Sequence, residues 1–145
     1  MSTDPGRRPV VTGIGVVAPN GTSAEAFWKA TKEGVSVLDR VSRDGCGHLP
    51  LRVAGEVRGF DPGAVVEERY LVQTDRFTHF AMTAAVQALD DARLGRPGEG
   101  GPDDSGTGSP YAVGVVTAAG SGGGEFGQRE LQQLWGPSPR HVGPY

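Results

Sequence analysis

A glycine motif near the N-terminus is the first feature of the sequence that could bind a ligand. Gly13-x-Gly15-x-x-Ala18 follows a β-branched run and has the outline of a dinucleotide-binding fingerprint, in which helix amides hold a pyrophosphate. That geometry needs a helix that begins at the last small residue, whereas Pro19-Asn20-Gly21 intervenes and the expected helix cap is Thr22. Asp39 is roughly placed to hold a ribose, but no expected strand precedes it. We therefore favour a packing role, in which the glycines let a strand pass close under a helix.

The other groups suited to catalysis or metal binding are few. Gly120-Ser121-Gly122 misses the spacing of a nucleophile elbow, and the glycine run that ends at Gly124 lacks the Gly-Lys-Ser/Thr ending of a P-loop. Cys46 and His48 supply too few donors for a metal site. His79 lies off the apolar stripe of its expected helix, which predicts a solvated side chain. Motif chemistry alone therefore identifies no catalytic residue, no metal site and no cofactor.

The composition indicates one folded domain with at least one flexible segment. The chain has 145 residues, of which 24 are glycine and 11 proline, and 37% are hydrophobic. A net charge of −3 argues against nucleic acid or an anionic membrane as a partner, and no apolar stretch approaches the length of a membrane span. The single cysteine excludes an internal disulfide framework, and the N-terminus has no cleavage-site pattern. These features predict a cytoplasmic protein.

The elements that must position any site begin after a tail over residues 1–9. Residues 10–18 are rich in β-branched side chains and predict a buried strand that ends at a Pro-Asn-Gly turn. Thr22-Ser23-Ala24-Glu25 fits a capping box, with the Thr22 hydroxyl accepting from the amide of Glu25. The helix that follows is expected to stop at Gly34, a residue suited to the left-handed conformation after a helix.

The middle of the chain contains the clearest helical pattern. Residues 51–57 alternate apolar and polar types, which predicts a short half-exposed strand, and 61–68 predict a turn or a brief helix. A long buried helix is expected to begin at Thr74 or Asp75. Its apolar residues recur at helical spacing and are mostly small: Phe77, Phe80, Ala81, Ala84, Ala85, Ala88, Leu89 and Ala92.

The C-terminal part predicts another strand and helix. Residues 95–110 hold no large apolar residue and are expected to form a flexible loop. Residues 111–118 predict a second buried strand, which should share a sheet with 10–18, and 125–135 predict a helix. Alternating strands and helices predict an α/β fold with a mainly parallel sheet covered by buried helices.

Several stretches carry a resemblance to a known family. The run from Val10 to Gly21, followed by Phe27-Trp28, resembles the opening of the β-ketoacyl synthases, which have the layered thiolase fold. Residues 54–61, Gln73-Thr74-Asp75-Arg76 and 115–135 narrow the resemblance to the chain length factors, the β subunits of type II aromatic polyketide ketosynthases. The resemblance covers nearly everything except the expected loop.

The resemblance implies a non-catalytic subunit that pairs with a ketosynthase α subunit. In such pairs the α subunit carries a cysteine nucleophile and two histidines, and an acyl carrier protein delivers the phosphopantetheine-bound polyketide. The chain length factor has lost the nucleophile, commonly to glutamine, and helps to shape a tunnel at the dimer interface that limits polyketide length. The nucleophile position lies beyond Tyr145, so residues 10–145 correspond to the N-terminal part of the domain and no catalytic residue is carried over.

One functional region of the family does fall within this chain. The segment after the second strand supplies bulky side chains that close the tunnel, and many relatives have phenylalanine where this chain has Gly124 and a larger residue at Gly127. Leu131 shares that helix face. The two glycines predict a wider tunnel and a longer product, unless a rearranged turn moves Phe126 into the gap.

Three other interpretations stay open on sequence alone. The chain could be the N-terminal part of an active β-ketoacyl synthase whose cysteine and histidines lie beyond residue 145. It could be a nucleotide-binding module built on Gly13 and Gly15. It could also be a truncated product whose apolar helix face lacks its cover, which predicts aggregation of the segment alone.

Overall fold

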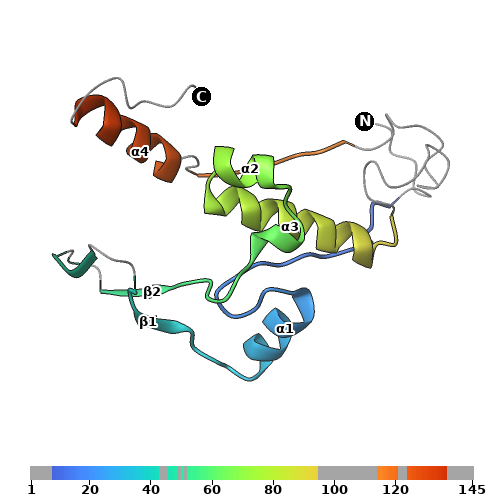
Figure 1. The fold of residues 1–145 in the computed structure, drawn as a ribbon. Coiled ribbons are helices and arrows are strands. Elements are labelled where there is room, and N and C mark those ends of the chain that lie inside the picture. The colour runs from blue at the N-terminus through green and yellow to red at the C-terminus, as the bar shows by residue number, and fades with distance from the viewer. Residues whose placement is uncertain are drawn as a thin grey trace.

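Four α-helices and one small sheet make up the regular structure of the residues that the computed structural model describes, which are 8–42, 46–48, 50, 52–94, 114–120 and 124–136. In chain order the elements are α1 (Ala24–Lys32), β1 (Leu38–Arg40), η1 (Cys46–His48), β2 (Val53–Gly55), η2 (Pro62–Ala64), α2 (Glu68–Gln73), α3 (Arg76–Asp91) and α4 (Gly124–Trp135), where η denotes a short 3₁₀ helix. Figure 1 shows α3 at the centre, with α1 and the β1–β2 pair on one side and α2 and α4 at one end. The expected tail over 1–9, apart from residues 8 and 9, and the expected loop over 95–110 lie outside the described residues.

The N-terminal run is extended and lies along α3 (Figure 1). The predicted buried strand over 10–18 is wrong in two respects: no strand is formed there, and Val10 and Val11 are 77% and 80% exposed. The backbone finds its partners on α3 instead, since Ile14 N donates to Asp91 Oδ2 (2.9 Å) and Val16 N donates to Gln87 Oε1 (3.0 Å). Side chains of a helix therefore take the place of a neighbouring strand.

The glycines of the N-terminal motif pack directly against α3. A Cβ atom on Gly13 would lie 2.8 Å from the Cβ of Ala92, and one on Gly15 would lie 2.8 Å from the backbone nitrogen of Ala88. Side-chain carbons do not approach backbone that closely, so only glycine fits at either position. The packing interpretation of the motif is confirmed, and the small residues of the long helix supply the other half of the contact.

Helix α1 forms where the sequence predicted it, with its cap shifted by one residue. The N-cap is Ser23, whose Oγ accepts from Ala26 N at 3.2 Å, and not Thr22 as the capping box predicted. The carbonyl of Thr22 is instead held by the side chain of Gln87 at 2.7 Å, which keeps that residue outside the helix. Gly34 has a φ of +65° two residues after the helix, as its type predicted.

The sheet within the described residues is a two-stranded antiparallel pair. β2 confirms the strand predicted within 51–57, and its partner β1, which the sequence did not predict, pairs Asp39 with Ala54. The mainly parallel sheet is thus not found in the described part of the chain. Residues 114–120 form no strand and share no sheet with 10–18, and Val115 and Val116 are 86% and 97% exposed. Residues 111–113 of the second predicted strand lie outside the described residues, and the sheet pairing within the described part joins only β1 and β2.

The buried residues of the described chain lie near the corner between α2 and α3. Val66, which follows η2, is 2% exposed, and the Phe60 and Phe80 rings meet edge to face with centroids 4.9 Å apart. The long helix was predicted within two residues of its observed ends, but its buried positions differ from the predicted ones. His79 is 8% exposed, so its predicted solvation is wrong, whereas Phe77 of the apolar stripe is exposed. The cause is the α2–α3 corner, which folds over the face that bears His79.

Candidate functional site

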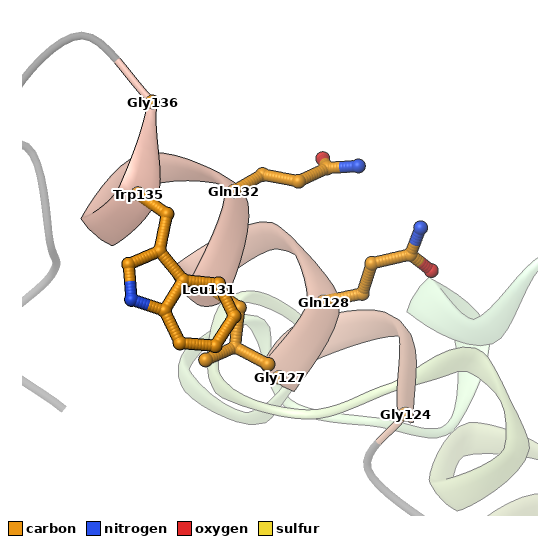
Figure 2. Close-up of a pocket in the computed structure, with 7 residues that line it drawn as sticks. All are labelled: Gly124, Gly127, Gln128, Leu131, Gln132, Trp135 and Gly136. Atoms are coloured by element: carbon orange, nitrogen blue, oxygen red, sulfur yellow. The ribbon is translucent and has the colours of Figure 1, made fainter.

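One face of α4 lines an open groove of about 640 Å³ (Figure 2). The lining residues recur at helical spacing along this face: Gly124, Gly127, Gln128, Leu131, Gln132, Trp135 and Gly136. Because each residue of a helix adds about 1.5 Å, the face is about 18 Å long from Gly124 to Gly136. Figure 2 shows Gln128 and Gln132 extending together in one direction and Leu131 and Trp135 lying together in another. The groove therefore runs along one helix and combines amide side chains with apolar ones.

Gly124 and Gly127 leave one end of this groove without side chains. A Cβ atom at Gly124 or at Gly127 would meet nothing within 4 Å in the described structure, so neither glycine is required by close packing. Neither has a positive φ. This separates them from Gly13 and Gly15, which are locked against α3. The space at this end of α4 is consequently set by the missing side chains rather than by the backbone.

The predicted tunnel residues are brought together with one exception. Gly124, Gly127 and Leu131 line the same groove, as their spacing on the helix indicated. Phe126 is not part of the lining, and its backbone nitrogen donates to Asp75 Oδ1 at 2.6 Å. The described geometry therefore gives no support to the alternative in which Phe126 fills the gap left by the glycines.

Sequence reasoning missed how this helix is held in place. Asp75 was expected to cap α3, and it occupies that N-cap position, but its side chain makes no capping bond there. Its carboxylate accepts instead from Phe126 N and from Glu125 N (3.2 Å), in the first turn of α4. Asp75 is 5% exposed. The only signal in the sequence was the position of Asp75 at the start of α3, within Gln73-Thr74-Asp75-Arg76. Local capping rules predict that such an aspartate caps its own helix, not another one.

The neighbours of Asp75 fix the same corner. Thr74 Oγ1 donates to the carbonyl of Tyr70 at 2.6 Å and lies 3.1 Å from His79 Nε2. Arg76 Nη2 donates to the carbonyl of Val57 at 2.8 Å, and its guanidinium lies over the rings of the Phe60–Phe80 pair, 5.7 and 5.2 Å from their centroids. Thr74 thus connects the two helices of the corner, while Asp75 ties the corner to α4 and Arg76 ties it to Val57.

The groove is electrically neutral. None of its seven lining residues is titratable, and its side-chain polar groups are the amides of Gln128 and Gln132 and the indole N–H of Trp135. The ionisable groups with perturbed pKa values lie elsewhere, near the β1–β2 pair. There, hydrogen bonds from Ser42 to Glu56 lower the pKa of that carboxyl below its ordinary value of 4.5. Such a groove is suited to holding an uncharged chain and offers no acid, base or nucleophile.

The described residues offer neither a metal site nor a membrane-spanning helix. No group of three or more histidine, cysteine, aspartate or glutamate side chains is placed there to hold a metal ion. Among the same residues, no helix combines the length and apolar character needed to cross a membrane.

Comparison with known proteins identifies the family. The model of the β-ketoacyl synthase N-terminal domain matches residues 7–144, so the chain belongs to the β-ketoacyl synthase family. It is 67% identical over 139 residues to a polyketide β-ketoacyl synthase 2 of Streptomyces cyaneus, covering 96% of this chain and 32% of that protein. It is 49% identical over 136 residues to the tetracenomycin polyketide synthase ketoacyl synthase β subunit of Streptomyces glaucescens, covering 94% of this chain and 31% of that one.

A solved structure supports the same assignment. The ishigamide ketosynthase/chain length factor superposes with a TM-score of 0.68 at 25% identity, covering 93% of this chain and 32% of that chain. The thiolase-like ketosynthase fold expected from the resemblance is thereby supported. The chain spans about a third of the length of the relatives that it matches.

Proposed function

We propose that this chain contributes the tunnel-forming N-terminal part of a non-catalytic, chain-length-determining subunit in a type II polyketide ketosynthase heterodimer. The observation that carries the proposal is the neutral groove along α4, on the helix where the resemblance expects the residues that limit chain length. The similarity to a named polyketide ketoacyl synthase β subunit supports the same function.

The groove has the chemistry that a growing polyketide requires. A poly-β-keto chain is uncharged and presents carbonyl oxygens along a carbon skeleton. Gln128 and Gln132 offer amide donors on one side of the groove, while Leu131 and Trp135 offer apolar surface on the other. Because Gly124 and Gly127 leave one end open, the subunit should admit a longer chain than a relative with phenylalanine there.

We expect a partner subunit beside the groove, because the lining comes only from α4 and Gly136 and leaves the groove open. Trp135, at one end of the groove, is 77% exposed, and Val115 and Val116 precede α4 with almost no cover. The similarity to a ketoacyl synthase β subunit supports a ketosynthase α subunit as this partner, with an acyl carrier protein delivering the substrate to a cytoplasmic assembly.

The test is a graded substitution at Gly124 in the complete heterodimer. Gly124→Phe should shorten the main product, and Gly124→Ala should have a smaller effect in the same direction, measured as carbon count by mass spectrometry. Gly47→Phe is the matched control, because a Cβ there also meets nothing within 4 Å and lies outside the groove. A product of unchanged length from active Gly124→Phe heterodimer would overturn the proposal.

The second candidate is an active β-ketoacyl synthase whose cysteine and histidines lie beyond residue 145. The family assignment includes this function as well, because the matching model is that of the β-ketoacyl synthase N-terminal domain. The two functions separate in a heterodimer whose α subunit has its nucleophilic cysteine replaced by alanine. Loss of all condensation supports the non-catalytic subunit, and retained condensation supports the synthase.

A further inference from the structure

The start of α4 is held by a carboxylate that comes from far away in the sequence. Asp75 precedes Phe126 by 51 residues, yet its two oxygens accept from successive backbone amides of the first turn of α4, Oδ1 from Phe126 and Oδ2 from Glu125. The first amides of a helix have no carbonyl partner within the helix. A negative side chain at this end is also favoured by the helix dipole. Asp75 therefore does for α4 what a local N-cap residue does for most helices.

This contact is enclosed rather than a surface contact. Asp75 is 5% exposed, the lowest value among the buried polar residues of the described chain. A buried carboxylate that lost these two donors would be left without compensation for its desolvation. The cost of separating Asp75 from α4 is thus greater than for an exposed cap, which makes the contact a strong positional constraint.

Asp75 is itself held in place by the corner between α2 and α3. The Thr74 hydroxyl has one proton, which it donates to the carbonyl of Tyr70, so it accepts from the Nε2–H of His79. The two bonds fix the backbone at Thr74 in an extended conformation, with φ −134° and ψ 164°, between the two helices. Arg76 ties the next residue to the carbonyl of Val57. The corner thereby aims the carboxylate at a defined point.

The first turn of α4 is also where the groove begins. Gly124 and Gly127 flank the two amides that Asp75 holds, and both glycines line the groove. Glycine in a helix is less favourable than alanine by roughly 1 kcal/mol per residue. A helix that starts with two glycines in its first four residues needs an external anchor to begin at a fixed residue, and Asp75 supplies one.

We propose that Asp75 is a positioning residue for chain-length control: by fixing where α4 begins, it sets the shape of the open end of the groove. This inference rests on the function proposed above. When Asp75 is replaced, the first turn of α4 should fray, so that the wall formed by Gly124 and Gly127 loses its fixed position. The expected consequence is a loss of precision in product length rather than a simple shortening.

The experiment uses Asp75→Asn in the complete heterodimer, because asparagine keeps the shape but replaces one acceptor by a donor that faces an amide. Hydrogen exchange, followed by mass spectrometry of peptides covering residues 124–131, should be about fivefold faster for the amides of Glu125 and Phe126. The same variant should make products of at least two lengths where the unaltered protein makes one main product. Asp75→Glu, which keeps both acceptor oxygens, should restore much of the protection.

The control is Asp91→Asn, which removes a carboxylate acceptor at the other end of α3, where Asp91 accepts from Ile14 N. It should leave both the exchange of α4 and the product ratio unchanged. Unchanged exchange at residues 124–131 in Asp75→Asn would overturn the inference, as would a lower total yield at an unaltered product ratio. If Gly124→Phe also left product length unaltered, the proposed function would fall, while the exchange data would still decide whether Asp75 positions α4.

Discussion

Replacement of Gly15 by alanine is the sharpest test of how α3 is held. The new Cβ would overlap the carbonyl oxygen of Ala84 and lie 2.8 Å from the backbone nitrogen of Ala88. Ordinary van der Waals contact begins at 3.4 Å, so the extended segment must move away from α3 by at least about 0.6 Å at this point. Both atoms belong to helix backbone, which has no rotamer with which to yield.

That movement also weakens the hydrogen bonds on either side of Gly15. Val16 N lies 3.0 Å from Gln87 Oε1, and a further 0.6 Å puts the pair beyond hydrogen-bond distance. Ile14 N is bound to Asp91 Oδ2 at 2.9 Å and faces the same displacement. Two lost bonds at about 1 kcal/mol each and an overpacking strain of about 1–3 kcal/mol give a destabilisation of about 3–5 kcal/mol.

The assay is urea unfolding of the complete heterodimer, with Gly47→Ala as the matched control. Gly47 has open space around its Cβ position and no positive φ, so alanine there should change the unfolding free energy by less than about 0.5 kcal/mol. The reasoning is refuted if Gly15→Ala unfolds at the same urea concentration as the control. Weaker dinucleotide binding by Gly15→Ala than by both the unaltered protein and Gly47→Ala would also refute it, because it would restore the ligand interpretation of the motif.

Three further changes test other parts of the account. Ser23→Ala should lower the unfolding free energy, measured by urea titration, by about 1 kcal/mol, because the Ser23 side chain caps α1. Thr22→Ala should leave it nearly unchanged, because Thr22 is not the N-cap. Hydrogen bonds from Ser42 depress the pKa of Glu56 below 4.5, so this carboxylate stabilises the fold above that pH, and the stabilisation is lost as the pH falls through the depressed value. Glu56→Gln should therefore make the unfolding free energy depend less steeply on pH between pH 5 and pH 3. Arg76→Met should cost about 2 kcal/mol in the same urea assay, through one lost hydrogen bond and two lost ring contacts, and an unchanged midpoint would contradict the role of the corner.

Local patterns in the sequence were enough to predict α1, α3 and α4, but they missed α2, which begins where the turn or brief helix predicted over 61–68 ends. The spacing of apolar residues placed α3 and α4 almost at their observed ends, and the type of Gly34 marked the end of α1. The packing role of Gly13 and Gly15 was also predictable, because the interrupting Pro-Asn-Gly turn argued against a phosphate site. These features depend on residues close in sequence, where propensity, capping and steric rules apply directly.

The partners across long sequence distances could not be predicted in this way. The strands over 10–18 and 111–118 were predicted from apolar runs. Strand pairing also depends on which segments lie alongside, and an apolar run does not specify its partner. The burial of His79 depends on the corner that α2 makes, and the role of Asp75 depends on a helix that starts about 50 residues later. Of the candidate site, the shared face of Gly124, Gly127 and Leu131 was predictable from helical spacing, whereas its anchor was not.

Photochemical crosslinking would test most directly whether the groove along α4 holds the growing chain. An acyl carrier protein bearing a phosphopantetheine-linked acyl chain with a terminal diazirine would be irradiated with the complete heterodimer, and the labelled peptides sequenced by mass spectrometry. If the groove holds the growing chain, label should appear on this chain within Gly124–Gly136, the residues that bound the groove. Label confined to the partner subunit, or to parts of this chain remote from α4, would contradict it.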